Sequence, residues 1–207
     1  MNPSFLSKSE WRKRLLDARR GMDEQDRRKR DRRIFERLVQ SERWHEASGV
    51  MAYVSMPGEV ETSAILDRAI EEGKRLFLPR CAAGVKSFEV VEVENIAKEL
   101  ETGPFPGLMQ PLASLDALPG FSPPKAPFEL VLTPGIGFDR SGTRIGFGAG
   151  MYDRFFEAWP GVFRLALTYE MQLVDKLPSN DYDRPMHAIV TEERWLDIQS
   201  LDGSKDD

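Results

Sequence analysis

The sequence predicts an α/β fold: a single three-layer α/β/α domain, Rossmann-like, with a mainly parallel sheet. Short apolar runs, typical of buried strands, alternate with amphipathic segments of helical period. One strand, helix and strand in succession form a βαβ unit, whose crossover makes its two strands parallel. The chain has 207 residues, of which 41% are hydrophobic, enough to build a large core. We therefore expect residues 1–207 to form one domain.

Two helices are expected at the start of the chain. Apolar residues recur every three or four positions on both sides of Gly21, and Gly21 and Asp23 provide a helix stop and an N-cap. Basic residues clearly outnumber acidic ones from Lys8 to Arg33. We interpret most of this charge as the solvated outer face of a helical hairpin, with a minority of cations left as candidates for phosphate binding.

The first βαβ unit follows these helices. Residues 49–56 (GVMAYVSM) form a buried strand that ends at a Pro-Gly turn. Thr62 is the expected N-cap of the crossover helix, and Gly73 ends that helix in the left-handed conformation. Residues 75–79 form the second strand.

The middle of the chain is rich in proline. Residues 88–93 are expected to form a strand, followed by a short helix that runs into Gly103. Half of the 14 prolines lie between residues 104 and 127, so we expect a long surface loop there. Such a loop either contributes to function or simply tethers two strands. The remaining elements are a strand, a helix and two strands, at 129–133, 152–159, 162–168 and 187–191.

Residues 133–154 (TPGIGFDRSGTRIGFGAGMYDR) are the most informative about function, because they lie between a strand and a helix. Gly146, Gly148 and Gly150 alternate, so successive N–H groups can curl around an anion beside the positive end of the helix. Arg144 supplies the forked cation that phosphate oxygens prefer. Because the segment matches neither the Walker A pattern nor GxGxxG, a flexible turn is the competing interpretation.

Carboxylates near this segment are candidates for metal binding. Asp153, in the first helical turn, either complements the helix dipole or holds the magnesium that accompanies a nucleotide. Asp181 and Asp183 precede the last strand, so one of them can reach the same sheet edge. The alternative for both is a turn before Pro185.

Glu59 follows the first strand, where a carboxylate could recognise N–H donors of a heterocycle or orient a reacting group. The competing role is an acid near a helix N-terminus, which Glu61 fits better because it adjoins Thr62.

Composition excludes several classes of protein. The single cysteine, Cys81, cannot form an intramolecular disulfide or a multi-cysteine zinc site, which indicates a reducing cytoplasm. A net charge of −5 opposes general nucleic-acid binding. We find no signal peptide and no run of roughly 18 apolar residues, and therefore expect a soluble, unprocessed chain without membrane partners.

At these residues the chain resembles the 5-formyltetrahydrofolate cyclo-ligase family, also called methenyltetrahydrofolate synthetases. The family pattern begins with Pro-Gly-x-x-Phe-Asp after a strand, and residues 134–139 (PGIGFD) match it. The pattern continues with a glycine turn, matched by Gly142. It ends with Arg-Leu/Ile-Gly-x-Gly-x-Gly-x-Tyr-Asp-Arg, matched by residues 144–154 (RIGFGAGMYDR). The resemblance extends over most of the chain, through Lys8 and Arg12, Met56 to Thr62, Leu78 to Arg80, and Tyr182 to Glu192. Spacing back from Thr191 selects Asp183 as the family's metal-ligating aspartate.

The resemblance implies an ATP- and magnesium-dependent ligase that cyclises 5-formyltetrahydrofolate to 5,10-methenyltetrahydrofolate and releases ADP and phosphate. Phosphoryl transfer turns the formyl oxygen into a leaving group, and N10 attacks the activated carbon. Such a reaction needs positioning and charge neutralisation more than a protein nucleophile, and the sequence shows no Ser-His-Asp or Cys-His arrangement.

The resemblance also implies roles for individual residues. Arg144 and Glu59 are the expected catalytic residues, and Asp153 and Asp183 are the expected magnesium ligands. The residues expected to bind ATP are Lys8, Arg12, Arg144, Ile145, Gly146, Phe147, Gly148, Ala149, Gly150, Met151 and Tyr152. Those expected to bind the folate are Val54, Glu59, Phe147, Gly148, Ala149, Gly150 and Met151.

The chain departs from the family pattern at Met151, Ala149 and Gln110, and we expect these departures to affect folate affinity rather than activity. One alternative is a non-catalytic folate or nucleotide binder on the same scaffold. Another is a nucleic-acid-binding regulator built on the basic N-terminal hairpin, which the sparse aromatic residues and the negative charge disfavour. The expected protein is a cytoplasmic monomer whose partners are small molecules, with ATP as co-substrate and Mg²⁺ as cofactor.

Overall fold

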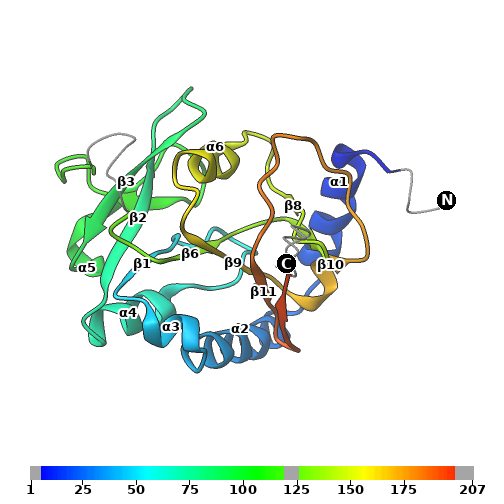
Figure 1. The fold of residues 1–207 in the computed structure, drawn as a ribbon, viewed down its shortest axis with the longest axis horizontal. Coiled ribbons are helices and arrows are strands. Elements are labelled where there is room, and N and C mark those ends of the chain that lie inside the picture. Colours follow the sequence, from blue (N-terminus) through cyan, green and yellow to red (C-terminus); the bar gives the residue numbers. More distant parts are fainter. Residues whose placement is uncertain (1–5, 119–125, 199–207) are drawn as a thin grey trace, which may run out of the picture.

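A seven-stranded sheet forms the centre of the computed structural model, which describes residues 6–118 and 126–198 (Figure 1). The strands lie in the order β12-β11-β9-β6-β1-β2-β3. The five inner strands are parallel and the two edge strands antiparallel, which confirms the predicted mainly parallel sheet. Their bounds are β1 (Gly49–Met51), β2 (Arg75–Cys81), β3 (Phe88–Val93), β6 (Leu130–Thr133), β9 (Phe163–Leu167), β11 (Ala188–Val190) and β12 (Trp195–Asp197).

The strand order locates the ligand-binding edge of the sheet. Numbered along the chain, the five parallel strands are arranged 2-1-3-4-5, the flavodoxin-like order of doubly wound folds. The chain therefore reverses direction across the sheet between β1 and β6. In such sheets ligands bind beyond the carboxyl ends of the strands at this switch point. The segments after Met51 and after Thr133 end up beside it.

Helices cover both faces of the sheet, as predicted. On one face α2 (Glu24–Val39), α3 (Glu42–Glu46) and α4 (Ser63–Glu71) bury Ile34, Trp44 and Leu66 in the first core cluster. On the other face α6 (Met151–Ala158) buries Phe155 and Phe156. In Figure 1 α6 lies above the sheet and the other three lie below it. Each such side chain contributes about 1.5–3 kcal/mol by burial, so both faces are firmly covered.

A third core cluster attaches α1 (Lys8–Arg20) to the end of the sheet. Trp11 and Leu15 pack with Ile136, Ile145 and Leu177. These partners lie in or near a small sheet of order β10-β7-β8. Its strands are β7 (Gly137–Asp139), β8 (Arg144–Ile145) and β10 (Leu173–Val174). A 3₁₀ helix, η2 (Glu170–Gln172), directly precedes β10. A Cβ on Gly137 would lie 2.2 Å from Leu15 Cδ1, so a glycine there permits the close packing of α1.

Most helix ends follow the predicted signals. Gly21 follows α1, and the Asp23 side chain accepts hydrogen bonds from the N–H groups of Gln25 and Asp26 at the start of α2. Gly73, with φ +71°, lies just beyond α4 and allows the left-handed turn.

Thr62 is at the predicted N-cap position, but the prediction that its side chain caps the helix is wrong. Thr62 occupies the N-cap position of α4, but its hydroxyl donates to the Tyr53 carbonyl instead of capping the helix. Glu61 Oε1 accepts the N–H groups of Thr62 and Ser63 and does the capping. The role assigned to Glu61 as an acid at the helix start is therefore confirmed.

The middle of the chain differs from the prediction. The strand expected over residues 49–56 ends at Met51. The helix before Gly103 is only α5 (Ile96–Glu99), and the next residues form β4 (Leu100–Thr102), which pairs antiparallel with β5 (Met109–Pro111). The absence of regular structure expected over 104–127 is thus wrong in its described part, while 119–125 lie outside the described residues. Proline is compatible with an edge strand because it forfeits only one ladder hydrogen bond.

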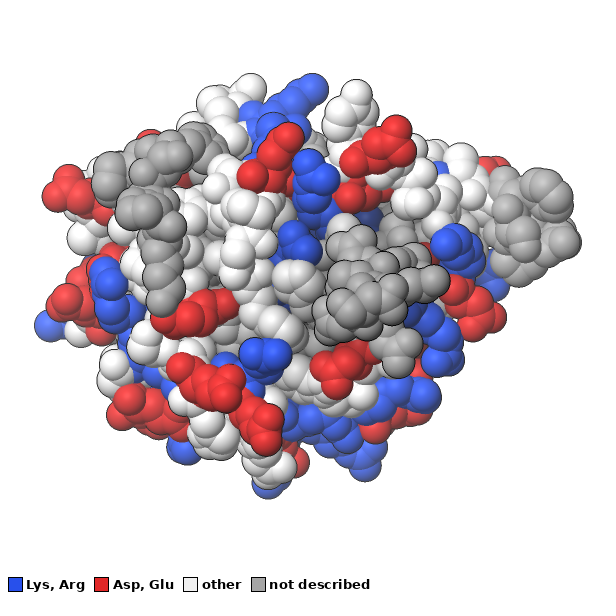
Figure 2. All heavy atoms as spheres, viewed as in Figure 1, with Lys and Arg blue, Asp and Glu red and all other residues white. Residues whose placement is uncertain are grey.

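The basic charge of α2 is largely balanced by neighbouring acids. Arg28 pairs with Glu24 at 2.5 Å and Arg32 with Glu36 at 2.8 Å, all with exposed side chains. Acidic and basic side chains are interspersed on the face shown in Figure 2. These pairs agree with the interpretation of the hairpin charge as a solvated face. Across residues 6–118 and 126–198, none of the helices combines the length and apolar character needed to cross a membrane.

Candidate active site

Two cations of α1 reach the segments that follow the switch point. Lys8 and Arg12 are one helical turn apart and point to the same side. The ammonium group of Lys8 lies 2.5 Å from Asp183 Oδ2, and Arg12 Nε donates to the Gly146 carbonyl at 2.8 Å. The structure therefore brings the start of the chain against both the glycine segment and the loop before β11.

The glycine segment, residues 144–150, is shaped by its missing side chains. Gly148 and Gly150 have φ values of +101° and +65°, and Gly150 is the N-cap of α6. A Cβ on Gly146 would lie 2.8 Å from Arg144 Nη1, and one on Gly148 would lie 3.4 Å from Arg12 Nη2. Two guanidinium groups thus lie close to the backbone just ahead of the helix N-terminus, the combination that favours an anion.

Arg144 is almost fully buried beneath this segment. Its side chain is 7% exposed, and its Nη2 donates to Asp153 Oδ1 at 3.0 Å. The guanidinium also lies over the Tyr152 ring, 5.5 Å from the centroid. Arg144 Nε and the Tyr152 hydroxyl are buried polar atoms without a hydrogen-bond partner within the described structure. Unsatisfied groups of this kind are uncommon in native interiors and cluster at functional sites.

Asp153 and Asp183 lie at neighbouring points of the site. Asp153 Oδ1 also accepts the N–H of Arg184, the residue next to Asp183, at 3.3 Å. Asp183 Oδ2 accepts the Asn180 N–H, whereas Asp181 is exposed. Over the described ranges, no three His, Cys, Asp or Glu side chains gather into a metal-binding group. A carboxylate pair nevertheless fits Mg²⁺, which commonly takes one or two protein oxygens and completes its shell with phosphates and water.

Glu59 is the buried carboxylate beyond β1. The residue is 6% exposed, and its Oε2 accepts the Met56 N–H at 3.0 Å. Burial raises the pKa of Glu59, although the Met56 N–H and the Arg19 charge act in the opposite direction. Its backbone carbonyl accepts the Tyr169 hydroxyl, which also lies 2.7 Å from Asp31 Oδ1. The carboxylate is therefore held in one place by both its side chain and its backbone.

Some of the predicted site residues belong mainly to the core. Ile145 is 2% exposed and packs with Trp11, so its side chain belongs to the third core cluster. The Tyr152 ring packs among Phe88, Phe155 and Phe156. Val54 is partly exposed and packs against the first core cluster.

Other predicted residues form the exposed part of the glycine segment. Phe147 is 56% exposed, and Ala149 is exposed as well. Met151, the first residue of α6, is half-buried. Phe147 and Met151 are thus available to cover a flat ligand.

Sequence reasoning missed two residues beside the site. Arg154 donates to the carbonyls of Ala149 and Lys86, which ties the glycine segment to the hairpin between β2 and β3. Arg19 is 8% exposed and lies between Gly58 and Gly135. Its spacing was a usable signal, because Trp11, Leu15 and Arg19 follow one another every four residues and so share the buried face of α1.

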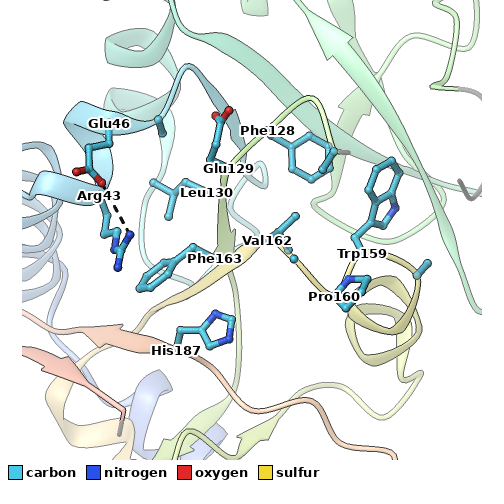
Figure 3. A pocket seen from close by; sticks show the side chains of 14 residues that line it. Arg43, Glu46, Phe128, Glu129, Leu130, Trp159, Pro160, Val162, Phe163 and His187 are labelled. Carbon is cyan, nitrogen blue, oxygen red and sulfur yellow. Dashed lines mark ion pairs between the residues drawn. The ribbon is translucent and has the colours of Figure 1, made fainter. Parts of the chain in front are cut away.

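A cavity of about 640 Å³ opens at the opposite, amino ends of β6 and β9 (Figure 3). It is lined by aromatic rings, including Trp159 and Phe163, but its charged groups already have partners. Glu129 accepts the N–H groups of Ser48 and Gly49, and Arg43 lies over Phe163 and beside Glu46. None of the predicted site residues lines it, so we place the candidate site at the other end of the strands.

The sheet order and these contacts define the class of protein: a doubly wound α/β protein with a cationic, glycine-lined site at the carboxyl edge of its sheet. The chain belongs to the 5-formyltetrahydrofolate cyclo-ligase family, whose model matches residues 5–192.

Individual relatives agree with this membership over most of their length. The chain is 26% identical to a probable 5-formyltetrahydrofolate cyclo-ligase of Caenorhabditis elegans, over 94% of this chain and 97% of the relative. It is 30% identical to the 5-formyltetrahydrofolate cyclo-ligase of Escherichia coli, over 70% and 78%. The solved 5,10-methenyltetrahydrofolate synthetase of Aquifex aeolicus superimposes with a TM-score of 0.79 at 26% identity, covering 96% of this chain and 98% of that one.

Proposed function

We propose that this protein cyclises 5-formyltetrahydrofolate to 5,10-methenyltetrahydrofolate with ATP and Mg²⁺, releasing ADP and phosphate. The observation that carries the proposal is the convergence of Arg12 and Arg144 on one glycine segment, with Lys8 one helical turn from Arg12 and paired with Asp183 in the neighbouring loop. The chain that carries this arrangement belongs to the cyclo-ligase family. Three cations near a glycine-rich helix N-terminus suit a triphosphate. The folate substrate and product of the proposal are taken from the names of the relatives.

The nucleotide is bound by exchange of partners. Lys8 pairs with Asp183, and Arg144 pairs with Asp153. The phosphates of ATP compete for these cations, and the carboxylates are then available to a metal. Asp153 and Asp183 would hold Mg²⁺, which would neutralise charge on the phosphoryl group being transferred.

The reaction proceeds in two displacements at bound substrates. The formyl oxygen of the folate attacks the γ-phosphorus, the bond to the β–γ bridging oxygen breaks, and ADP leaves. The N10 lone pair then attacks the formyl carbon, N10 loses its proton to solvent, and the C–O bond breaks to release phosphate and the cyclic amidinium. Arg144 and Lys8 hold the phosphates in line, and Glu59 accepts N–H donors of the folate ring.

A direct assay tests this proposal. Purified protein with ATP, Mg²⁺ and 5-formyltetrahydrofolate should form the absorbing methenyl product together with an equal amount of ADP. A protein that is thermally stabilised by folate or ATP, yet forms no ADP and no methenyl product at any Mg²⁺ concentration, is a binder and the proposal is wrong.

We further propose that the enzyme is a monomer that works in the cytoplasm on small molecules. The support for the compartment is the single thiol, Cys81, which leaves the chain without an internal disulfide. Light scattering of the purified protein, which should give a mass near 23.6 kDa, tests the oligomeric state.

A further inference from the structure

Arg19 is a buried cation that the reaction above does not use. It is the second-last residue of α1, and only 8% of its surface is exposed. Its guanidinium carries five N–H donors, of which Nη1 makes a long hydrogen bond of 3.5 Å to the Gly135 carbonyl. Within residues 6–118 and 126–198, its nitrogens have no carboxylate within the 4.0 Å of an ion pair. A buried arginine without such a partner is unusual, because burial of an unpaired charge is costly.

The position of Arg19 links the two strands at the switch point. Gly135 follows β6, and Gly58 follows β1. Gly58 has a φ of +88°, and a Cβ on it would lie 3.3 Å from Arg19 Nε. A glycine at this position thus admits the guanidinium to the backbone immediately before Glu59. Arg19 spans the place where a doubly wound sheet binds its ligand.

Few charged or titratable groups act on the Glu59 carboxylate from the elements around it. Arg19 contributes from α1, Tyr53 from the segment after β1, and Tyr152 from α6. Both phenols are neutral, since burial raises the pKa of each. On the backbone side, Tyr169 and Asp31 hold the carbonyl of Glu59 and the N–H of Glu61. Within the described structure Arg19 is thus the cation that lies against the turn of residues 56–59, which the Glu59 carboxylate closes by accepting the Met56 N–H. Like that N–H, its charge opposes the effect of burial on the pKa of Glu59.

We propose that Arg19 is a positioning residue that keeps Glu59 in its carboxylate form for recognition of the folate ring. The proposal rests on the proposed function, in which Glu59 accepts N–H donors of the bound folate. A carboxylate offers two oxygens as acceptors, whereas the protonated acid places a competing O–H among them. Binding of the folate excludes more water and favours the neutral acid, and the nearby guanidinium opposes that change.

The pH dependence of folate recognition tests this role. Arg19→Met removes the charge and keeps the length, and Arg19→Lys keeps the charge. The matched control is Arg20→Met, because Arg20 is the next residue, its side chain is 76% exposed, and it pairs with Asp17 at 3.6 Å. For each protein, kcat and KM for 5-formyltetrahydrofolate and for ATP are measured between about pH 5 and pH 9.

In Arg19→Met we expect the acid limb of kcat/KM for the folate to move up by about 0.5–1 pH unit. The folate KM should rise about tenfold below that limb, while the ATP KM stays within about twofold. Arg19→Lys and Arg20→Met should retain the limb of the unmodified enzyme. A folded Arg19→Met protein with an unchanged limb and folate KM overturns the proposal.

Two further measurements separate this proposal from stability and from the proposed function. Arg19→Gln is a second charge-free variant that can still donate to the Gly135 carbonyl. If neither charge-free variant folds, Arg19 is a structural residue and the proposal is wrong. Calorimetric titration of 5-formyltetrahydrofolate over the same pH range reports on Arg19 without turnover. It therefore gives an answer even if the unmodified protein forms no product.

Discussion

Lys8 and Asp183 form an ion pair with 2.5 Å between Nζ and Oδ2, across 175 residues of sequence. The pair is partly buried, with side chains 27% and 19% exposed. It unites the first helix and the loop before β11, the two parts of the chain that carry a predicted phosphate ligand and a predicted metal ligand. Removal of either charge therefore affects both sides of the proposed nucleotide site.

We expect Lys8→Met to raise the KM for ATP about 10- to 100-fold, because one charge-assisted hydrogen bond to phosphate is lost. Lys13→Met is the control, since Lys13 is exposed on the same helix. Steady-state kinetics at saturating folate measure the effect. Equal ATP KM values for the two variants would remove Lys8 from the nucleotide site.

Asp153→Asn should reduce kcat/KM on the order of 100-fold and shift the Mg²⁺ titration to higher concentration. The amide keeps the shape of the side chain, so circular dichroism and the melting temperature should show a folded protein. Asp181→Asn is the control, because Asp181 is exposed near the same loop. A normal Mg²⁺ titration in Asp153→Asn contradicts the assignment of this carboxylate to the metal.

Gly148→Ala should destabilise the protein and weaken ATP binding. The φ of +101° at Gly148 is unfavourable for any other residue, at about 1–2 kcal/mol, and the new Cβ would contact Arg12. Gly161→Ala is the matched control, because a Cβ there meets no atom within 4 Å. Denaturant unfolding should show the loss only in Gly148→Ala, with an ATP KM raised about tenfold.

Gln110→Leu should lower stability by about 1–3 kcal/mol with little effect on the folate KM. Gln110 is 6% exposed, and its Oε1 accepts the Cys81 N–H at 3.0 Å, which joins β5 to the end of β2. The substitution leaves that buried N–H without an acceptor. Gln25→Leu, at an exposed position of α2, controls for the loss of an amide. A large increase in folate KM without loss of stability would assign Gln110 to the substrate instead.

His187 should make the protein less stable at mildly acidic pH. Burial, with the nearby Arg164 and Arg43 charges, lowers the pKa of His187 to about 4. Between about pH 6.5 and pH 4 the unfolded chain binds a proton there that the folded protein does not, so stability falls as the pH falls. Because His187 is half-exposed, we expect a loss of about 1–2 kcal/mol.

Thermal unfolding of His187→Gln at pH 7.5 and at pH 5 measures this contribution. The variant has no imidazole to titrate and should lose less stability than the unmodified protein over that interval. The same loss in both proteins would show that His187 carries no part of the acid sensitivity.

The sequence predicted well those helices and strands whose ends are set by neighbouring residues, such as a capping side chain or a glycine. Gly21, Asp23 and Gly73 marked helix ends correctly, and β3 has the predicted bounds. The missed strands β4, β5, β7, β8, β10 and β12 have two or three residues each, and the missed helical segments α3 and η2 have five and three. A strand so short has no visible two-residue period and depends on a partner distant in sequence, which no local pattern records.

The sequence predicted which residues belong to the motifs of the candidate site, but not how those residues contact one another in space. The spacing of the glycines and Arg144 is a local property, so those residues could be found in the sequence. The burial of Ile145 and the partners of Arg19 depend on how α1 packs against β7 and β8. The contacts of Asp31 and Tyr169 to the Glu59 loop likewise join residues up to 138 positions apart, without any motif of their own.

The long separation of Lys8 and Asp183 also has a consequence for biosynthesis. A ribosome adds about 5–20 residues per second, so Asp183 emerges on the order of 10–35 seconds after Lys8. During that interval Trp11 and Leu15 lack Ile136, Ile145 and Leu177, the residues that cover them in the finished protein. Helix α1 therefore docks only after much of the chain that follows it has been made. A newly synthesised chain therefore completes the proposed nucleotide site only after Asp183 has left the ribosome.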